Sequence, residues 1–131
     1  MIGLDTNVLL RLFIDDDLRQ YDRARRFFDA TGATETSVVN AVVLAEFAWT
    51  LVRGFRKKRD EAAHLIAELL SADDVEIQHR SAAERALAAY RKGKADFPDY
   101  FLAEINLDLG CASTATFDQA ALDHSAFSPV S

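Results

Sequence analysis

The sequence predicts one α/β domain, a three-layer α/β/α sandwich with a short central parallel sheet. Short apolar segments with strand character alternate with longer segments in which apolar residues recur at helical spacing. This alternation is typical of parallel sheets that are covered by helices on both faces. The chain has 131 residues, half of them hydrophobic, and contains no internal repeat or linker. One domain spanning residues 1–131 is therefore expected, since such a length buries about two-thirds of the unfolded surface.

In the first part of the chain we expect two strands and four helices, whose ends are marked by capping and helix-breaking residues. The aspartates at 15–17 end one helix and cap the next, and Gly32 closes that second helix. Asn40 is a good N-cap for the helix that follows, and Gly54 ends it. The predicted elements are a strand at 2–4, helices at 6–13 and 18–30, a strand at 37–39, and helices at 41–53 and 60–70.

The second part of the chain predicts three strands and two helices. Ser81 is expected to cap an amphipathic helix that ends near Gly93. Asp96 opens the next helix, with Pro98 tolerated in its first turn, and Gly110 stops it. The predicted elements are a strand at 75–77, helices at 81–93 and 96–109, a strand at 112–116, and a last strand at 126–127.

Glu46 is the most informative residue of the sequence. It lies in the middle of the helix predicted at 41–53, where almost every other residue is apolar, and such helices are normally buried. A buried carboxylate costs several kcal/mol unless it is paired, protonated or bound to a metal. No Lys or Arg lies within four residues to pair with it. We therefore expect Glu46 to be compensated from outside its helix or to open onto a wet cavity.

Aspartates elsewhere lie where they could share such a cavity. Asp5 and Asp118 each follow a predicted strand, and parallel sheets bind ligands beyond the carboxyl ends of their strands. A structural reading stays open for each of them, because Asp5, Asp96 and Asp118 could be helix N-caps and Asp99 the capping-box partner of Asp96. Converging carboxylates would suit Mg²⁺ or Mn²⁺, which select oxygen ligands and support attack on phosphodiesters.

Four segments that contain these acids resemble the motifs of PIN-domain nucleases, specifically VapC-type toxins of bacterial and archaeal toxin–antitoxin pairs. The resemblance covers nearly the whole chain, and the four segments follow in order at ordinary spacing. The segments are Met-Ile-Gly-Leu-Asp5-Thr-Asn-Val-Leu, Val-Leu-Ala-Glu46-Phe-Ala-Trp-Thr-Leu, Ala-Asp96-Phe-Pro-Asp99-Tyr-Phe-Leu-Ala and Ala-Thr116-Phe-Asp118.

The resemblance implies an Mg²⁺-dependent endoribonuclease, with Mn²⁺ as a substitute cation. Asp5 and Asp99 would be the principal metal ligands, Asp118 a further ligand, and Glu46 would position or deprotonate the attacking water. The groups that hold these carboxylates by hydrogen bonds would be Thr6, Asn7 and Thr116. Asp96 would be a further candidate beside them or only a helix cap. The same resemblance implies RNA as the substrate, a cognate antitoxin protein as a partner, and a homodimer. The alternative is a catalytically inactive PIN-like module that binds RNA or a protein.

Composition indicates where in the cell the protein is located and how it could bind RNA. No apolar run is long enough for a membrane span, the N-terminus lacks a signal-peptide pattern, and the single Cys111 cannot form an internal disulfide. These features predict a cytoplasmic protein. The net charge of −6 argues against a general nucleic-acid coat protein, but a local basic patch is compatible with RNA binding. That patch comprises Arg53, Arg56, Lys57, Lys58 and Arg59, unless it is only a solvated turn.

Other sites fit the sequence less well. The three histidines share no metal-ligand spacing, which argues against a histidine-based metal site. Haloacid-dehalogenase-type phosphatases need a second Asp two residues after the first, where this chain has Asn7. Phosphoreceiver domains need adjacent acids at the end of the first strand, but Thr6 follows Asp5. The sequence therefore favours the metal-dependent nuclease.

Overall fold

A computed structural model describes residues 1–130 as an α/β fold with parallel strands and six α-helices, as the sequence predicts. No helix within 1–130 is both long and apolar enough to cross a membrane. In chain order the elements are β1 (Ile2–Gly3), α1 (Thr6–Phe13), α2 (Leu18–Gly32), β2 (Ser37–Val39), α3 (Ala41–Arg53), α4 (Arg59–Leu70), β3 (Val75–Ile77), α5 (Arg80–Lys92), α6 (Phe97–Asp108), β4 (Thr114–Thr116), the 3-10 helix η1 (Gln119–Ala121) and β5 (Phe127–Pro129).

Most helix ends follow the signals read from the sequence. The Asn40 side chain accepts a hydrogen bond from the Val43 backbone N–H at 2.9 Å, and Gly54 is the C-cap of α3. Asp17 caps α2 in the same way as Asn40 caps α3. Gly93 ends α5, and a side chain is excluded there because a Cβ would lie 1.9 Å from the hydroxyl of Tyr100. Capping therefore fixes where the helices begin and end.

The start of α5 differs from the prediction. The helix begins at Arg80, not after Ser81, and its N-cap is His79 in the left-handed region with φ of 58°. The guanidinium of Arg80 donates to the backbone carbonyls of Leu70 and Val75, the latter at 2.8 Å. These bonds to carbonyls of the preceding segment fix the position of Arg80, which a search for side-chain caps at the helix start could not detect.

The parallel strands form two separate sheets. In the first, β2 lies between β1 and β3, with Ile2 opposite Ser37 and Val38 opposite Glu76. In the second, β4 pairs only with β5, with Thr114 opposite Phe127. The prediction of parallel strands is confirmed, whereas their division into two sheets was not foreseen. Because β4 does not pair with β1, the ends of these two strands do not lie side by side.

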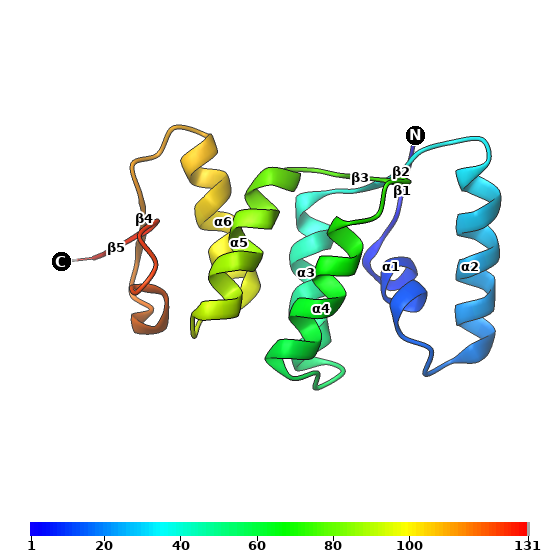
Figure 1. Cartoon of the computed structure of the whole chain (residues 1–131), viewed down its shortest axis with the longest axis horizontal. Helices are drawn as coiled ribbons and strands as arrows, with labels where there is room; N and C mark the ends of the chain where they lie inside the picture. Colours follow the sequence, from blue (N-terminus) through cyan, green and yellow to red (C-terminus); the bar gives the residue numbers. More distant parts are fainter. Residues whose placement is uncertain (131) are drawn as a thin grey trace.

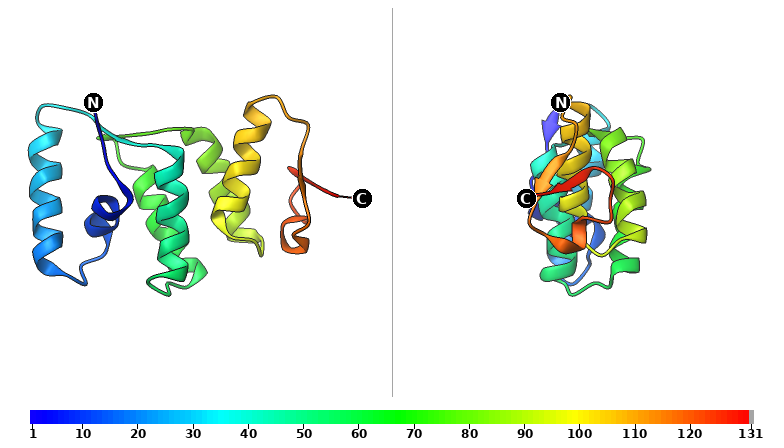
Figure 2. Two further views of the ribbon diagram at one scale, coloured as in Figure 1. Left: turned by 180° about the vertical axis from the view of Figure 1, so that it is seen from behind. Right: turned by 90° about the vertical axis from the view of Figure 1, so that its left-hand side faces the viewer.

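The helices form a row with α2 at one end and the β4–β5 pair beyond α6 at the other (Figure 1). The N-terminus lies beside the first sheet, at the opposite side of the molecule from the β4–β5 pair, and the view along the row shows a narrow cross-section (Figure 2). The accessible surface is 7672 Å². A compact protein of this mass would expose about 6,900 Å². The molecule is therefore somewhat elongated.

The core continues along the row of helices. α3 buries Leu44, Phe47 and Leu51 on the face that packs against its neighbours. Further along, the rings of Tyr90 and Phe97 meet edge-on with their centroids 6.2 Å apart. Burying such side chains contributes roughly 1.5–3 kcal/mol each. This continuous core holds α3 and α6, the two helices that carry candidate acids, against each other.

Candidate active site

The first two acidic motifs meet through Thr6. Asp5 follows β1 and caps α1, because its Oδ1 accepts a hydrogen bond from the Val8 N–H at 3.0 Å. The hydroxyl of the next residue, Thr6, donates to Oε1 of Glu46 in α3 at 3.0 Å. Forty positions separate Thr6 and Glu46 in the chain, so the fold alone brings these groups together. The predicted hydrogen-bonding partnership of Thr6 with a candidate catalytic carboxylate is present.

Glu46 is exposed, so its helix is not buried all round as the apolar sequence indicated, and the carboxylate accepts a hydrogen bond from Thr6, outside that helix. The apolar helix α3 is buried on one face only, and its outer face carries Val42, Glu46 and Trp49, with Val42 67% and Trp49 54% exposed. Positions four and three apart share one face of a helix, so these three side chains form one exposed stripe. Water can therefore reach the Glu46 carboxylate.

The third acidic motif caps α6. Asp96 is the N-cap residue, and Oδ2 of Asp99 accepts a hydrogen bond from the Asp96 backbone N–H at 3.2 Å. The Asp96 carboxylate pairs with Arg53 at 3.0 Å. Asp96 therefore makes the contacts of a helix cap and of an ion-pair partner. Partial burial raises the pKa of Asp99 above its ordinary value, and the negative charges of Asp96 and Asp118 add to this effect.

The fourth motif lies at the end of β4. Oδ1 of Asp118 accepts a hydrogen bond from the Ala120 N–H at 2.9 Å and so caps η1. The Asp118 backbone N–H in turn donates to the hydroxyl of Thr116 at 3.0 Å. Thr116 therefore holds the turn that carries Asp118. Asp118 is also close enough to Asp99 for their charges to interact.

The candidate acids thus lie in two regions: Glu46 is bonded to Thr6, the neighbour of Asp5 in the chain, whereas the charge of Asp118 acts on Asp99. Among residues 1–130, no three acidic, histidine or cysteine side chains lie near enough together to hold one metal ion. The physical reason is the separation of β4 from β1, because the end of each strand carries one of the acids. Convergence of all four acids, which the sequence suggested, is not seen.

The chemistry of the donors nevertheless fits a hard divalent cation. All four candidates are carboxylates, and Mg²⁺ takes one or two of them directly while keeping several waters. Each cap bond of Asp5 and Asp118 uses Oδ1 and leaves Oδ2 for another partner. The four residues therefore offer the oxygen ligands that a hydrated Mg²⁺ accepts.

Comparison with known families decides the identity of the fold. Residues 2–127 match the PIN domain family. The chain belongs to the PIN-domain family. Members of this family are mostly metal-dependent ribonucleases that use divalent cations. No curated protein matches the sequence. The acidic motifs read from the sequence therefore lie in a PIN domain that occupies nearly the whole chain.

The basic segment of this PIN domain splits into structural and exposed residues. The guanidinium of Arg59 donates to the carbonyl of Tyr90 at 2.8 Å and to that of Ala95, and it lies 4.1 Å from the centre of the Tyr90 ring. Arg59 therefore ties α4 to the end of α5. Arg56 and Lys58 are exposed, Lys57 is half-buried, and Arg53 is held by its pair with Asp96. Their RNA contacts stay a prediction.

Sequence reasoning missed Glu104, the one buried carboxylate of residues 1–130. Glu104 in α6 is only 4% exposed, and its two oxygens contact Nε of Arg85 at 2.7 Å and Nε2 of His124 at 2.8 Å. The signal that pointed to Glu46 was present here too, since Phe101, Leu102, Ala103 and Ile105 surround Glu104 in the sequence. These contacts give Glu104 a role in packing.

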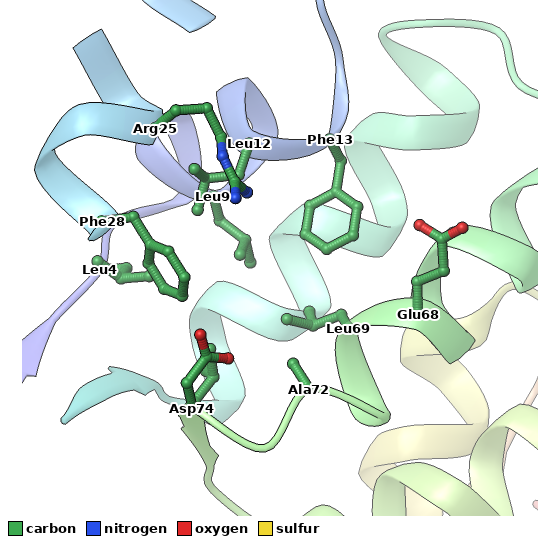
Figure 3. A pocket seen from close by; sticks show the side chains of 11 residues that line it. Leu4, Leu9, Leu12, Phe13, Arg25, Phe28, Glu68, Leu69, Ala72 and Asp74 are labelled. Atoms are coloured by element: carbon green, nitrogen blue, oxygen red, sulfur yellow. The ribbon is translucent and has the colours of Figure 1, made fainter. Parts of the chain in front are cut away.

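A cavity of about 380 Å³ lies between α1, α2 and α4 (Figure 3). Its lining is largely apolar and includes Leu9, Phe28 and Leu69, with charged groups from Arg25 and Asp74. None of the candidate acids lines it. The cavity is therefore separate from the candidate active site.

Proposed function

We propose that this PIN domain is a metal-dependent endoribonuclease. The observation that carries the proposal is the contact from Thr6 to Glu46, which joins the first and second acidic motifs of the family in one exposed place. In the β1–α1 turn and in α3, the side chains of Asp5 and Glu46 face solvent, where a large polymer can reach them.

Each acid has a role in this proposal. Asp99 and Asp118, whose charges interact, would hold Mg²⁺, or Mn²⁺ in its place, and Asp5 would join them as a ligand once the two regions approach each other. Glu46 would accept a proton from the attacking water, and Thr6 would fix the orientation of the Glu46 carboxylate. The bound cation would neutralise charge on the phosphodiester and make a water easier to deprotonate. The water oxygen would form the new bond to phosphorus while its proton passes to Glu46. The bond from phosphorus to one ribose oxygen would break, and the released oxygen would take up a proton from solvent.

Neighbouring groups would keep the carboxylates in place. Thr116 supports the Asp118 turn by its hydrogen bond, and Asn7 lies in the first turn of α1 beside Asp5 and Thr6. Side chains that orient metal ligands are commonly needed for full metal affinity. The hydrogen bond that the Asp96 backbone N–H donates to the Asp99 carboxylate likewise fixes the first turn of α6. The alternative function is binding of RNA or a protein without cleavage.

Cleavage of RNA with and without a divalent cation tests the proposal. Purified protein should cut total cellular RNA in Mg²⁺ or Mn²⁺, and EDTA should abolish the cutting. Mapping the new ends would then identify the sequence or structure that is cleaved. Protein that binds RNA but leaves it intact in either cation supports the binding module. Full cleavage in EDTA by a rigorously purified sample contradicts the metal mechanism.

We further propose that the nuclease is the cytoplasmic toxin of a toxin–antitoxin pair and acts as a homodimer. An exposed acidic site attracts cations, and an Arg from a partner protein could form charge-assisted hydrogen bonds with Asp5 and Glu46. Such a partner would block the site by occupying the place of the metal. The resemblance of the four acidic motifs to VapC-type toxins supports this role.

Expression in a bacterial host tests the toxin role. The chain alone should arrest growth, and co-expression of the protein encoded beside it should restore growth and yield a stable complex. An equally expressed Glu46→Gln variant should be harmless and should still form the complex. Normal growth with soluble, folded wild-type protein would contradict the toxin role without contradicting nuclease activity.

A further inference from the structure

A second cavity of about 690 Å³ lies between α1 and α2 and opens to solvent. Its floor includes small and apolar side chains, and its remaining lining is polar, basic or aromatic. The residues that matter for its chemistry are Asn7, Arg11, Gln20, Arg23, Arg26 and Phe27.

The cleft is basic in an acidic protein. The chain carries a net charge of −6, yet no carboxylate lines this cavity. Arg11 is held by an ion pair with Asp16. Arg23 and Arg26 are exposed and have no ion-pair partner anywhere in the described chain, residues 1–130. Two guanidinium groups on one helix face are thus available to an anion.

An exposed aromatic side chain lies beside these arginines. Phe27 is 44% exposed, whereas the next residue, Phe28, points into the core and is 8% exposed. Phe27 follows Arg23 by one helical turn, so both lie on the same face of α2. Proteins bind single-stranded nucleic acids with two kinds of side chain: basic groups that follow the phosphate backbone, and aromatic rings on which a base stacks.

None of the four candidate acids lines this cleft, but it adjoins the turn that carries the first of them. Asn7, which lines the cleft, is the second residue after Asp5 and directly follows Thr6, the residue bonded to Glu46. A peptide partner could also use two arginines, but the position of the cleft next to this turn favours the substrate of the site.

We propose that the α1–α2 cleft binds single-stranded RNA on its way to the acidic site. Arg23 and Arg26 contact phosphates, and Phe27 stacks against a base. This inference rests on the proposed ribonuclease function and assigns the path of its substrate.

Binding of a fluorescein-labelled twelve-nucleotide uridine RNA in EDTA, where the proposed cleavage cannot proceed, tests the arginines. Fluorescence anisotropy is measured between 50 and 200 mM salt. Each phosphate contact adds about 0.7 to the slope of log affinity against log salt concentration, so two contacts add about 1.4. Between 50 and 200 mM salt, wild type should therefore lose about sevenfold more RNA affinity than Arg23→Ser/Arg26→Ser. The matched control is Arg91→Ser/Lys92→Ser, which removes two exposed positive charges from α5 and should keep the wild-type slope.

Phe27→Ala tests the stacking contact separately. It should weaken binding by about 5- to 150-fold, the range expected for losing one stacked base, and leave the salt slope unchanged. Thermal melting of each variant confirms that it is folded. Because Phe27 is partly exposed, its truncation should change the melting temperature little.

The outcomes separate this inference from the proposed function. If wild type cleaves RNA and the Arg23/Arg26 and Arg91/Lys92 variants share the wild-type salt slope, the cleft assignment is wrong and the nuclease stands. If wild type neither binds nor cleaves RNA, the proposed function fails as well. If the Arg23/Arg26 variant keeps RNA binding but loses a co-expressed partner protein, the cleft is a protein-docking site and the RNA path is wrong.

Discussion

Replacing Glu46 with Gln should give a folded protein that binds RNA and does not cleave it. The side chain is exposed and nearly keeps its volume, and the Thr6 hydroxyl can still donate to the amide oxygen. What disappears is the group that accepts a proton, and losing a general base typically costs about 10²- to 10⁴-fold in rate. Single-turnover cleavage in Mg²⁺, RNA anisotropy in EDTA and thermal melting measure the three properties.

Asp5→Asn and Asp118→Asn provide the matched comparison, because both residues are helix caps in the structure. Asn caps a helix about as well as Asp, so neither change should lower stability appreciably. Each removes a negative charge from a proposed metal site, so cleavage and the stabilisation by Mg²⁺ should both be lost. Wild-type cleavage rates in Asp5→Asn and Glu46→Gln would show that these acids have only structural roles.

Asp99→Asn should add a stability gain to the loss of cleavage. The pKa of Asp99 is raised in the folded state, so folding penalises its ionised form. This penalty on folding is absent at a pH below the pKa of Asp99 in the unfolded chain. It is complete at a pH above the raised pKa of Asp99 in the folded protein. Asn removes the charge and can still accept the hydrogen bond from Asp96. The free energy of unfolding at pH 7 should therefore increase, and denaturant titrations at pH 3 and pH 7 should show the gain only at pH 7.

Arg59→Ala should strongly destabilise the fold. Its guanidinium satisfies the carbonyls of Tyr90 and Ala95, both buried residues, and packs over the Tyr90 ring. Leaving buried acceptors without a donor costs about 1–3 kcal/mol each, so we expect about 3 kcal/mol in total. For a domain of this size that corresponds to about 10 °C in melting temperature.

Two further variants define what Arg59 contributes. Lys58→Ala removes a neighbouring exposed charge and should leave the melting temperature nearly unchanged. Arg59→Lys keeps the charge but cannot place donors at both carbonyls, so it should recover little stability. A small effect of Arg59→Ala on melting, together with weaker RNA binding, would instead return Arg59 to the RNA-binding role that the sequence suggested.

Local signals in the sequence predicted most elements of this PIN domain. Asn40 begins a helix, and Gly54 and Gly93 end helices, where capping rules place them; the short strands fall where apolar residues concentrate. Such signals depend on neighbours within a few positions, which the sequence displays directly. The start of α5 was misplaced because the Arg80 side chain is held by the backbone carbonyls of Leu70 and Val75, contacts that capping rules do not consider.

Burial and strand pairing were harder to predict because both depend on distant segments. Glu46 and Glu104 each lie among apolar neighbours, but α3 leaves Val42 and Trp49 exposed beside Glu46, whereas Glu104 is buried beneath Arg85 and His124. Apolar neighbours in sequence therefore did not reveal which acid is buried. Likewise, no local pattern specifies that β4 pairs with β5 alone, and this pairing decides which acids meet.

The buried Glu104 has a mechanical consequence. His124, between η1 and β5, is tethered to Glu104 at 2.8 Å, and the His124 ring lies edge-on to Tyr100 with centroids 5.3 Å apart. The segment that carries Asp118 is thus clamped to α6, the helix that carries Asp99. Asp99 and Asp118 should therefore move together as one rigid unit. A displacement that brings one of them toward Asp5 and Glu46 also brings the other.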